Sequence, residues 1–387
     1  MPLSRYERKR SLVGVIAAMA VVNLVYGITF PLLALVLDSQ GVSKTLIGLN
    51  TIAQAAAVIV IAPWTPDLLR RIAPSRVMQA VTALLAVLFI VAGMFPNVWF
   101  WFPLRLVIGA ATALLWISSE ALINDLAEEN WRGRIIGLYA SIGSAGFALG
   151  PLLLIMTGSS GMLPFFATSG LILCAGVPLF IVHHRQMVQH ERHQGGLWVL
   201  FWMAPAIMLA NVTYAAAAES LLTFFPLFGI SLGLAEHYTL GLMTVMGFGA
   251  MILVIPLSWV ADQVDRMGML ALCVLLAALG LLLMPWLLRE GWLAGVYAFV
   301  FGGVEAMIYT LGVTLVGERF KGALLAPATT LFTACWGLGT VLGPLLVGLG
   351  MDWQGEKWMA PAIAVLFALY LPLPLLGWYR GKRAPGA

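Results

Sequence analysis

Long apolar stretches, separated by short charged or Gly- and Pro-rich breaks, recur along almost the whole chain. A helix needs about 20 mainly apolar residues to cross the hydrocarbon core of a bilayer, and each stretch is long enough for one such helix. The pattern predicts twelve helices, at residues 11–37, 46–66, 76–95, 99–122, 135–156, 163–183, 198–228, 240–261, 268–288, 292–316, 323–350 and 358–379. We therefore expect an all-α membrane protein with twelve transmembrane helices.

The composition excludes a water-soluble domain. Hydrophobic residues make up 61% of the chain and charged residues only 10%, with a mean hydropathy of +0.96, whereas a soluble domain carries about 25% charged residues. The basic N-terminal residues precede a long apolar stretch, Leu12 to Leu37, that has no clear cleavage site of a signal peptide. We expect an uncleaved first transmembrane helix.

The placement of the basic residues predicts the orientation of the chain. With a cytoplasmic N-terminus, Lys44, Arg289 and Lys357 fall on the opposite face and Arg105 falls within a helix, which leaves 17 of the 21 basic residues in the cytoplasm. Cytoplasmic loops carry such an excess of Lys and Arg. We therefore expect a multi-pass protein of the bacterial inner membrane with both termini in the cytoplasm. The net charge of +4 then gives no reason to expect nucleic acid as a partner.

Two parts of the sequence repeat each other at about half the length of the chain. The element Gly146-x3-Gly150-Pro151 of the fifth predicted helix reappears 193 residues later as Gly339-x3-Gly343-Pro344 of the eleventh. Phe30-Pro31-Leu32 of the first predicted helix recurs as Phe225-Pro226-Leu227 of the seventh, at an offset of 195 residues. Two matches at nearly the same offset are stronger evidence of an internal repeat than either match alone.

The repeat predicts the domain organisation. Because an even number of helices separates the copies, the two halves run in the same direction through the membrane, as parallel repeats about an axis along its normal. We expect two pseudo-symmetric six-helix bundles, at residues 1–183 and 198–387, joined by a cytoplasmic linker at 184–197.

With these features, the sequence resembles the major facilitator superfamily over essentially its whole length. Gly146-x3-Gly150-Pro151 is similar to the helix 5 motif of the exporter and drug:proton antiporter branches. Its small residues allow two helices to approach closely, and its proline bends the helix; generic glycine packing is the alternative for one copy alone. The resemblance implies the major facilitator fold, with the first, fourth, seventh and tenth helices lining a central cavity.

The superfamily's signature loop, Gly-x3-Asp-Arg-x-Gly-Arg, is degraded between the second and third predicted helices. There, Pro66 replaces the glycine and Arg70 replaces the aspartate. The corresponding loop of the second half keeps its acidic and basic residues. By resemblance, the loop forms a charge clamp that stabilises one conformation. We assign the clamp to Asp262, Asp265 and Arg266, with Arg70 and Arg71 as its altered counterpart in the first half.

The fourth and tenth predicted helices narrow the resemblance. Arg105-x3-Gly109 looks like the superfamily's helix 4 motif. Trp116-Ile-Ser-Ser-Glu120, together with Gly302-Gly303 and Tyr309, is similar to the YcaD-like bacterial permeases. This subgroup does not identify the transported molecule.

Three of the 17 carboxylates, Glu120, Glu219 and Glu305, fall inside apolar stretches. A charge at the centre of a bilayer costs about 2.5–3.5 kcal/mol on insertion scales, so such groups face a cavity, a partner or a proton path. Burial also favours the protonated form of a carboxylate. Glu305, one turn after Gly302, is our first candidate for proton coupling or substrate contact; Glu219 is the second and Glu120 the third. Structural pairing or snorkelling to water is the alternative for each.

The fourth predicted helix carries a stripe of residues at helical spacing. Arg105, Trp116 and Glu120 lie along it, and we expect the stripe to face the central cavity. Arg105 and Glu120 are about 22 Å apart at 1.5 Å per residue, so they do not pair with each other. Arg105 therefore binds an anionic substrate, finds another partner, or orients its helix by bonding backbone carbonyls.

Asn and Tyr residues add further candidates on the first and seventh predicted helices. Asn23 and Tyr26 are about one turn apart, and Asn211 and Tyr214 have the same spacing. Polar groups beside aromatic surface suit an amphipathic ligand, although both residue types also form ordinary hydrogen bonds between helices.

The sequence lacks the motifs of ATP-driven transport, of enzymatic catalysis and of metal binding. No Gly-x4-Gly-Lys-Ser/Thr loop occurs, which excludes transport driven by ATP within this chain. We find no nucleophile–base pairing, so we do not expect an enzyme. Cys174, Cys273 and Cys335 lie in apolar stretches, and no Cys or His accompanies the methionines of the eighth predicted helix at ligand spacing. We expect neither a metal nor a cofactor.

These observations favour a secondary transporter that exports a small organic, amphipathic molecule in exchange for protons. The alternatives are an uptake permease for a small anionic or polar solute, favoured if Arg105 binds substrate, and a lipid flippase or a membrane scaffold. Substrate, protons and membrane lipid are the expected partners, and we expect a monomer.

Overall fold

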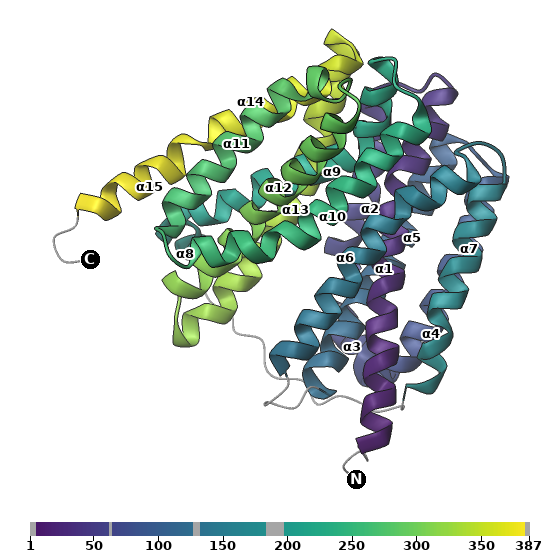
Figure 1. Ribbon diagram of the computed structural model, residues 1–387. Coiled ribbons are helices and arrows are strands. Elements are labelled where there is room, and N and C mark those ends of the chain that lie inside the picture. The colour runs from purple at the N-terminus through teal and green to yellow at the C-terminus, as the bar shows by residue number, and fades with distance from the viewer. Residues whose placement is uncertain (1–4, 62–63, 127–131, 183–196, 384–387) are drawn as a thin grey trace. The chain divides into compact units, whose positions relative to one another are not determined.

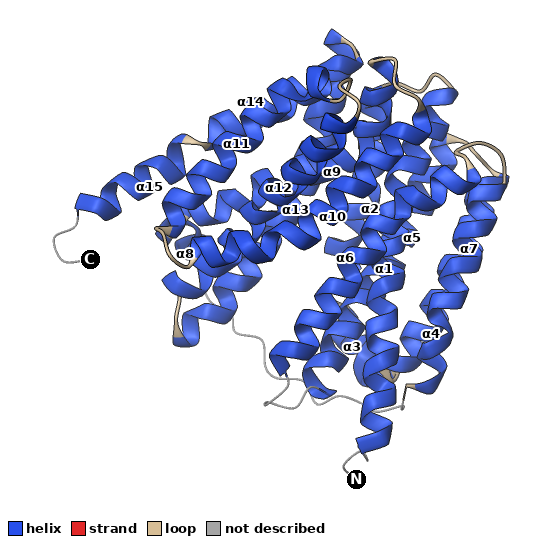
Figure 2. Cartoon of the chain, viewed as in Figure 1, coloured by secondary structure: helices blue, strands red, loops and turns tan. Residues whose placement is uncertain are grey.

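The computed structural model describes residues 5–61, 64–126, 132–182 and 197–383. Nearly all of these residues are helical, and no strand occurs among them (Figure 2). The first half comprises α1 (Arg5–Ser39), α2 (Lys44–Ile61), α3 (Thr65–Arg71), α4 (Pro74–Met94), α5 (Val98–Leu126), α6 (Arg132–Thr157), α7 (Leu163–Gly176) and η1 (Val177–Ile181). The second half comprises α8 (Leu197–Met203), α9 (Pro205–Ser231), α10 (Glu236–Ala261), α11 (Arg266–Leu287), α12 (Trp292–Arg319), η2 (Gly322–Leu324), α13 (Leu325–Gln354), η3 (Glu356–Trp358), α14 (Met359–Tyr370) and α15 (Pro372–Arg383).

The all-α membrane fold expected from the sequence is confirmed. Within the described ranges, ten helices are long and apolar enough to cross a membrane. The two remaining predicted segments coincide with α2 and with α6, whose apolar part is the shorter helix Ala145–Thr157. Every predicted transmembrane segment therefore has a helical counterpart. The break between α8 and α9 falls at Ala204, because the residue before a proline is disfavoured in helical conformation.

The chain forms two compact units. The first contains Met1–Val42 and Asn50–His190, and the second contains Ser43–Leu49 and Glu191–Ala387. The start of α2 thus packs with the second unit, although the rest of that helix packs with the first. The linker predicted at 184–197 lies, apart from its last residue, outside the described part of the chain.

In the first unit, helices approach closely enough for backbone contact at glycine. Helix α1 packs along α6 (Figure 1), and a Cβ at Gly150 of α6 would overlap the backbone of Gly27 of α1. Gly146, one turn earlier on α6, faces the carbonyl oxygen of Ala20. On another helix pair, a Cβ at Gly109 of α5 would overlap the carbonyl oxygen of Gln54 of α2. The helix 5 motif therefore acts in packing here.

The second unit repeats these contacts on the corresponding helices. A Cβ at Gly343 of α13 would overlap the backbone of Ala216 of α9, and one at Gly339 would overlap the carbonyl oxygen of Val212. A Cβ at Gly302 of α12 would likewise overlap the backbone of α10 at Met246. Within each half, the fifth transmembrane helix thus packs on the first and the fourth on the second. The repeat found in the sequence is also a repeat of helix contacts.

Pro151 and Pro344 occupy equivalent places directly after these glycines. Both lie inside their helices, α6 and α13, where each removes one backbone donor and favours a bend of the helix. The Gly-Pro pair thus combines a close approach with a change of direction.

The glycine contacts predict a sharp contrast between two single-methyl substitutions. We expect Gly343→Ala to lower stability by about 1–3 kcal/mol, because the added methyl must displace the backbone of α9. Gly170 of α7 is exposed, and an added methyl there would meet no neighbouring atom, so Gly170→Ala should be neutral or stabilise the helix by up to about 1 kcal/mol. Thermal unfolding of both variants in the same detergent tests this, and equal melting temperatures would contradict the packing role.

Candidate functional site

Three aromatic rings from three helices meet inside the second unit. The ring centroids of Tyr214 on α9, Tyr309 on α12 and Trp336 on α13 lie 5.5–5.6 Å from one another. Phe332, one turn before Trp336, lies 6.0 Å from Tyr309. We call Tyr214, Tyr309, Trp336 and Phe332 the aromatic cluster. The structure thereby brings together Tyr214 and Tyr309, two candidate residues from separate predicted helices.

Two buried carboxylates belong to the same region. Glu305 lies one turn before Tyr309 on α12, so the two residues share a face of that helix. Its side chain is 8% exposed, and its Oε1 accepts no hydrogen bond from any described residue. Glu219 on α9 is 7% exposed. Tyr214 is close enough to both carboxylates to interact with them electrostatically.

Asn211 is hydrogen-bonded to the backbone of one member of the aromatic cluster. Its Nδ2 donates a 2.6 Å hydrogen bond to the carbonyl oxygen of Phe332 and so ties α9 to α13. Its Oδ1 is buried and accepts no hydrogen bond from a described residue. The donor side of the amide therefore ties the two helices together at the cluster, and its acceptor is buried without a hydrogen bond from a described residue.

Arg105 is enclosed within the first unit. The residue is 1% exposed, and its guanidinium donates to Thr51 Oγ1 at 2.8 Å and to the carbonyl oxygen of Thr29 at 3.4 Å. It also lies 5.6 Å from the centroid of the Phe30 ring. These contacts connect α5 to α1 and α2, which favours the helix-orienting role over the binding of an anionic substrate.

The other candidates of the first unit make local contacts. Tyr26 stacks on Phe30 with centroids 5.5 Å apart, and Asn23 donates to the carbonyl oxygen of Met19 on its own helix at 3.0 Å. Trp116 Nε1 donates a 2.6 Å hydrogen bond to Glu120 Oε1 one turn further along α5. Among these residues, only the Trp116–Glu120 pair combines a carboxylate with an aromatic ring.

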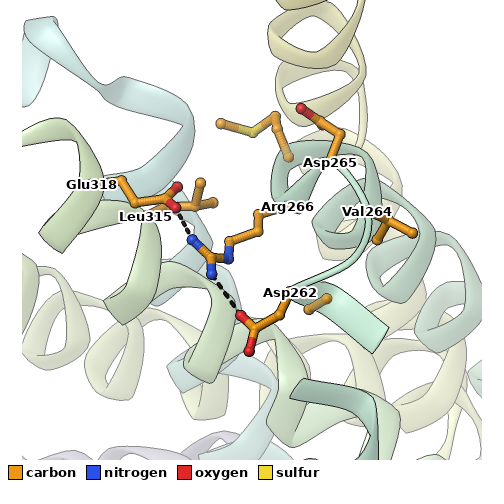
Figure 3. A pocket seen from close by; sticks show the side chains of 8 residues that line it. Asp262, Val264, Asp265, Arg266, Leu315 and Glu318 are labelled. Carbon is orange, nitrogen blue, oxygen red and sulfur yellow. Dashed lines mark hydrogen bonds and ion pairs between the residues drawn. The ribbon is translucent and has the colours of Figure 1, made fainter. Parts of the chain in front are cut away.

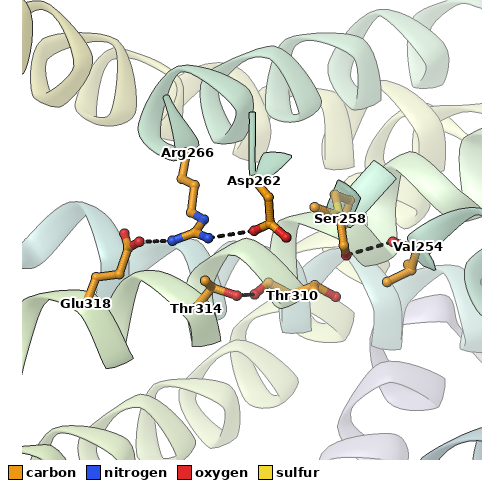
Figure 4. A network of polar contacts seen from close by, with 8 residues as sticks. Val254, Ser258, Asp262, Arg266, Thr310, Thr314 and Glu318 are labelled. Carbon is orange, nitrogen blue, oxygen red and sulfur yellow. Dashed lines mark hydrogen bonds and ion pairs between the residues drawn. The ribbon is translucent and has the colours of Figure 1, made fainter. Parts of the chain in front are cut away.

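The proposed clamp centres on Arg266, the first residue of α11 (Figure 3). Its guanidinium pairs with Asp262, at the end of α10, at 2.6 Å and also with Glu318 near the end of α12. Figure 4 shows the arginine lying between the two carboxylates, above Thr310 and Thr314 of α12. One cation thus connects three helix ends.

Asp265, the other carboxylate assigned to the clamp, caps a helix in this structure. Its side chain accepts a 2.6 Å hydrogen bond from the backbone N–H of Gly268 and caps the start of α11. In the first half, Asp67 and Arg70 form an exposed pair at 3.6 Å within α3, and Arg71 is exposed. An exposed pair of this kind contributes little to stability.

A second polar cluster joins the start of α2 to the end of α13. The carboxylate of Asp352 accepts hydrogen bonds from the backbone N–H groups of Lys44 and Thr45, both at 2.8 Å, and from Thr45 Oγ1 at 2.5 Å. Lys44 Nζ pairs with Glu356 at 2.8 Å. We call this the Asp352 cluster. The backbones also touch, because a Cβ at Gly348 would overlap the carbonyl oxygen of Lys44.

Sequence reasoning missed four of these residues: Phe332, Trp336, Glu318 and Asp352. The two aromatic residues lie in an apolar helix, where no polar neighbour marks them as unusual. Glu318 and Asp352 lie at helix ends, the ordinary place for a carboxylate in a membrane protein. The spacing of Thr310, Thr314 and Glu318 along one face of α12 was the available signal for Glu318.

Comparisons with known proteins agree with this architecture. The sequence profile of the Major Facilitator Superfamily matches residues 15–303 and 207–386. The uncharacterised MFS-type transporter YfkF of Bacillus subtilis is 23% identical over 334 residues, which cover 84% of this chain and 85% of that protein. The uncharacterised MFS-type transporter YcaD of Salmonella newport is 21% identical over 310 residues, 80% of each.

Two solved structures share the fold at low sequence identity. The nucleoside transporter NupG has a TM-score of 0.75 at 14% identity, over 96% of this chain and 99% of that one. The D-xylose-proton symporter has a TM-score of 0.72 at 13% identity, over 94% and 97% of the two chains. At these identities the likeness shows the fold and carries no information on substrate.

The Arg266 network predicts a small, salt-dependent contribution to stability. Because Asp262 is 63% exposed, a double-mutant cycle of Arg266→Ala and Asp262→Ala should give a coupling of at most about 1 kcal/mol. The coupling should fall as ionic strength rises, since salt screens exposed pairs. Thermal unfolding at low and high salt measures it. A large coupling that salt leaves unchanged would show that the network is buried.

Proposed function

We propose that this chain exports a small organic solute across the bacterial inner membrane in exchange for protons. The chain belongs to the Major Facilitator Superfamily and is a secondary transporter of that superfamily, and the proposal starts from that membership. The observation that carries the proposal is Glu305, buried mid-helix beside the aromatic cluster with an unsatisfied Oε1. A carboxylate at this depth is costly, and it is typical of a substrate or proton path.

Alternating access supplies the mechanism of the proposal. We expect α1, α5, α9 and α12 to line a central site, which the two units expose first to one side of the membrane and then to the other. Glu305 binds a proton when the site faces the side of higher proton activity and releases it on the other side. From the first unit, we expect Trp116 and Glu120 of α5 and Tyr26 of α1 to contribute to this site.

The competing function, uptake of an anionic solute, depends on Arg105 reaching the ligand. Its contacts with Thr51 and Thr29 and its 1% exposure speak against this. A neutral or cationic solute is the better match to a unit whose buried charged groups are carboxylates. We further propose both termini in the cytoplasm, from the distribution of Lys and Arg, and a functional monomer.

With that orientation, the two polar clusters lie on opposite sides of the membrane. The Arg266 network follows α10 and lies on the cytoplasmic side, whereas the Asp352 cluster lies at the connection between α1 and α2 on the outer side. We propose that the Arg266 network favours the outward-open conformation and that the Asp352 cluster favours the inward-open one. The two clusters then stabilise opposite conformations of the transporter.

Substitution of Glu305 tests the proton coupling. A ligand found by a thermal-shift screen of the purified protein is required first. We expect Glu305→Gln to abolish proton release on addition of that ligand and proton-driven net transport, while ligand exchange persists, because the amide mimics the protonated acid and has no proton to release. Glu290→Gln, a change in an exposed connection, is the matched control. Normal proton release in Glu305→Gln would transfer the role to Glu219, which Glu219→Gln tests in the same way.

Opposite changes of accessibility test the two clusters. In a background without Cys174, Cys273 and Cys335, a cysteine replaces Ala218, which lies one turn after Tyr214 on α9. We expect Asp352→Asn to raise its labelling by a membrane-impermeant maleimide added from outside, and Asp262→Arg to lower it. Changes in the same direction, or no change in either variant, would contradict the assignment of the clusters to opposite states.

A further inference from the structure

We propose that Glu305, Asn211 and the aromatic cluster form a binding site for an organic cation, a ligand whose positive charge is attached to an apolar body. The inference rests on the proposed function, because it names a class of substrate for the site of that function. It follows from three independent features: the sign of the buried charge, the unsatisfied hydrogen-bonding groups, and the chemistry of the surrounding rings.

The buried charge of this unit has one sign. Glu219 and Glu305 lie inside membrane-spanning helices, whereas each Lys, Arg and His between residues 198 and 387 lies in the first or last turn of a described helix or in a connection. Arg105, the buried cation of the first unit, is enclosed by its own contacts. Away from the ends of its described helices, this unit therefore carries buried carboxylates and no Lys, Arg or His, and a positively charged ligand complements Glu305.

The unsatisfied groups point to the same ligand. Glu305 Oε1 and Asn211 Oδ1 are both buried acceptors that no described residue satisfies. Glu305 is 8% exposed and Asn211 only 1%. A buried acceptor without a donor is costly, so a ligand that brings N–H groups relieves the cost. A carboxylate or phosphate ligand would bring further acceptors and make it worse.

The rings provide the third feature. A cation over the face of Trp, Tyr or Phe is attracted by the ring quadrupole, most strongly over Trp. Trp336 and Tyr309 are partly exposed, Tyr309 by 39%, so ring surface is accessible beside the buried carboxylate. The Asn211–Phe332 hydrogen bond holds α9 and α13 together at this point. The cluster is therefore a fixed surface for the ligand.

Simple packing is the competing explanation, because aromatic residues also fill space between helices. Packing accounts for the rings alone. It does not account for a buried carboxylate one turn from Tyr309, and it predicts no preference for the charge of a ligand. Charge selectivity therefore separates the two explanations.

The test uses probes of matched shape and different charge. 4-Phenylbutylamine, 4-phenylbutanol and 5-phenylpentanoate share a phenylbutyl body with a cationic, neutral and anionic end, and tetraphenylphosphonium is a bulkier cation. Calorimetric titration of the full-length protein in detergent, with empty micelles subtracted, measures their binding. We expect the amine to bind at least about tenfold more tightly than the alcohol, and the carboxylate most weakly.

Two variants and two controls locate the binding. Glu305→Gln should weaken binding of the amine about tenfold and leave the alcohol almost unchanged, and Trp336→Leu should weaken both cations about threefold to tenfold. Trp336→Phe keeps a ring and should recover part of the loss, which guards against misfolding of the leucine variant. Glu290→Gln and Trp353→Leu alter exposed positions and should change nothing.

The outcomes separate this inference from the proposed function. Failure of both cations to bind, equal binding of amine and alcohol, or unchanged affinity in Glu305→Gln would each overturn the cation site and leave a proton-coupled transporter of another solute intact. Conversely, charge-selective binding that depends on Glu305 supports the cation site even where the separate proton-release assay shows no coupling.

Discussion

Backbone contact at glycine is the constraint on which each helical unit depends. Lipid tails are as apolar as the side chains of the helices, so burial alone gives no drive for one helix to associate with another. Close packing has to supply it, and Gly150 and Gly343 allow their helices to touch the backbone of a neighbour. The same contacts place α9 and α13 near enough for Asn211 to reach the carbonyl oxygen of Phe332. The polar site is thus built on the small residues.

The two units use their polar groups differently. In the first unit, the terminal nitrogens of Arg105 donate to groups on α2 and α1, so its charge contributes to the arrangement of helices. In the second unit, Glu305 and Asn211 each keep an acceptor that the protein leaves unsatisfied. A buried acceptor without a donor lowers stability, so its presence needs an explanation. Binding of a ligand or a proton at that acceptor is one. The repeat is thus preserved in the glycine contacts, whereas the buried Arg105 of the first unit and the buried Glu305 of the second carry opposite charges.

Much of this arrangement could be predicted from the sequence, because hydropathy and small-residue patterns depend on the chain alone. The transmembrane segments, the glycine repeat and the burial of Glu305 are properties of this kind. The helix periodicity also places Tyr309 on the face of Glu305. It does not say which helix lies opposite, so Trp336 could not be connected to Tyr214 beforehand. For the same reason Asp265 and Glu318 could not be told apart as cap and clamp: both are carboxylates near helix ends.

The start of α2 depends on a side chain from a distant part of the sequence. The first backbone N–H groups of a helix have no carbonyl partner within that helix, and those of Lys44 and Thr45 both donate to the carboxylate of Asp352. Thr45 Oγ1 donates to the same carboxylate. Asp352 lies near the end of α13 (Leu325–Gln354), so one helix supplies the cap of another. Loss of this one carboxylate would leave three donors at the start of α2 without their acceptor.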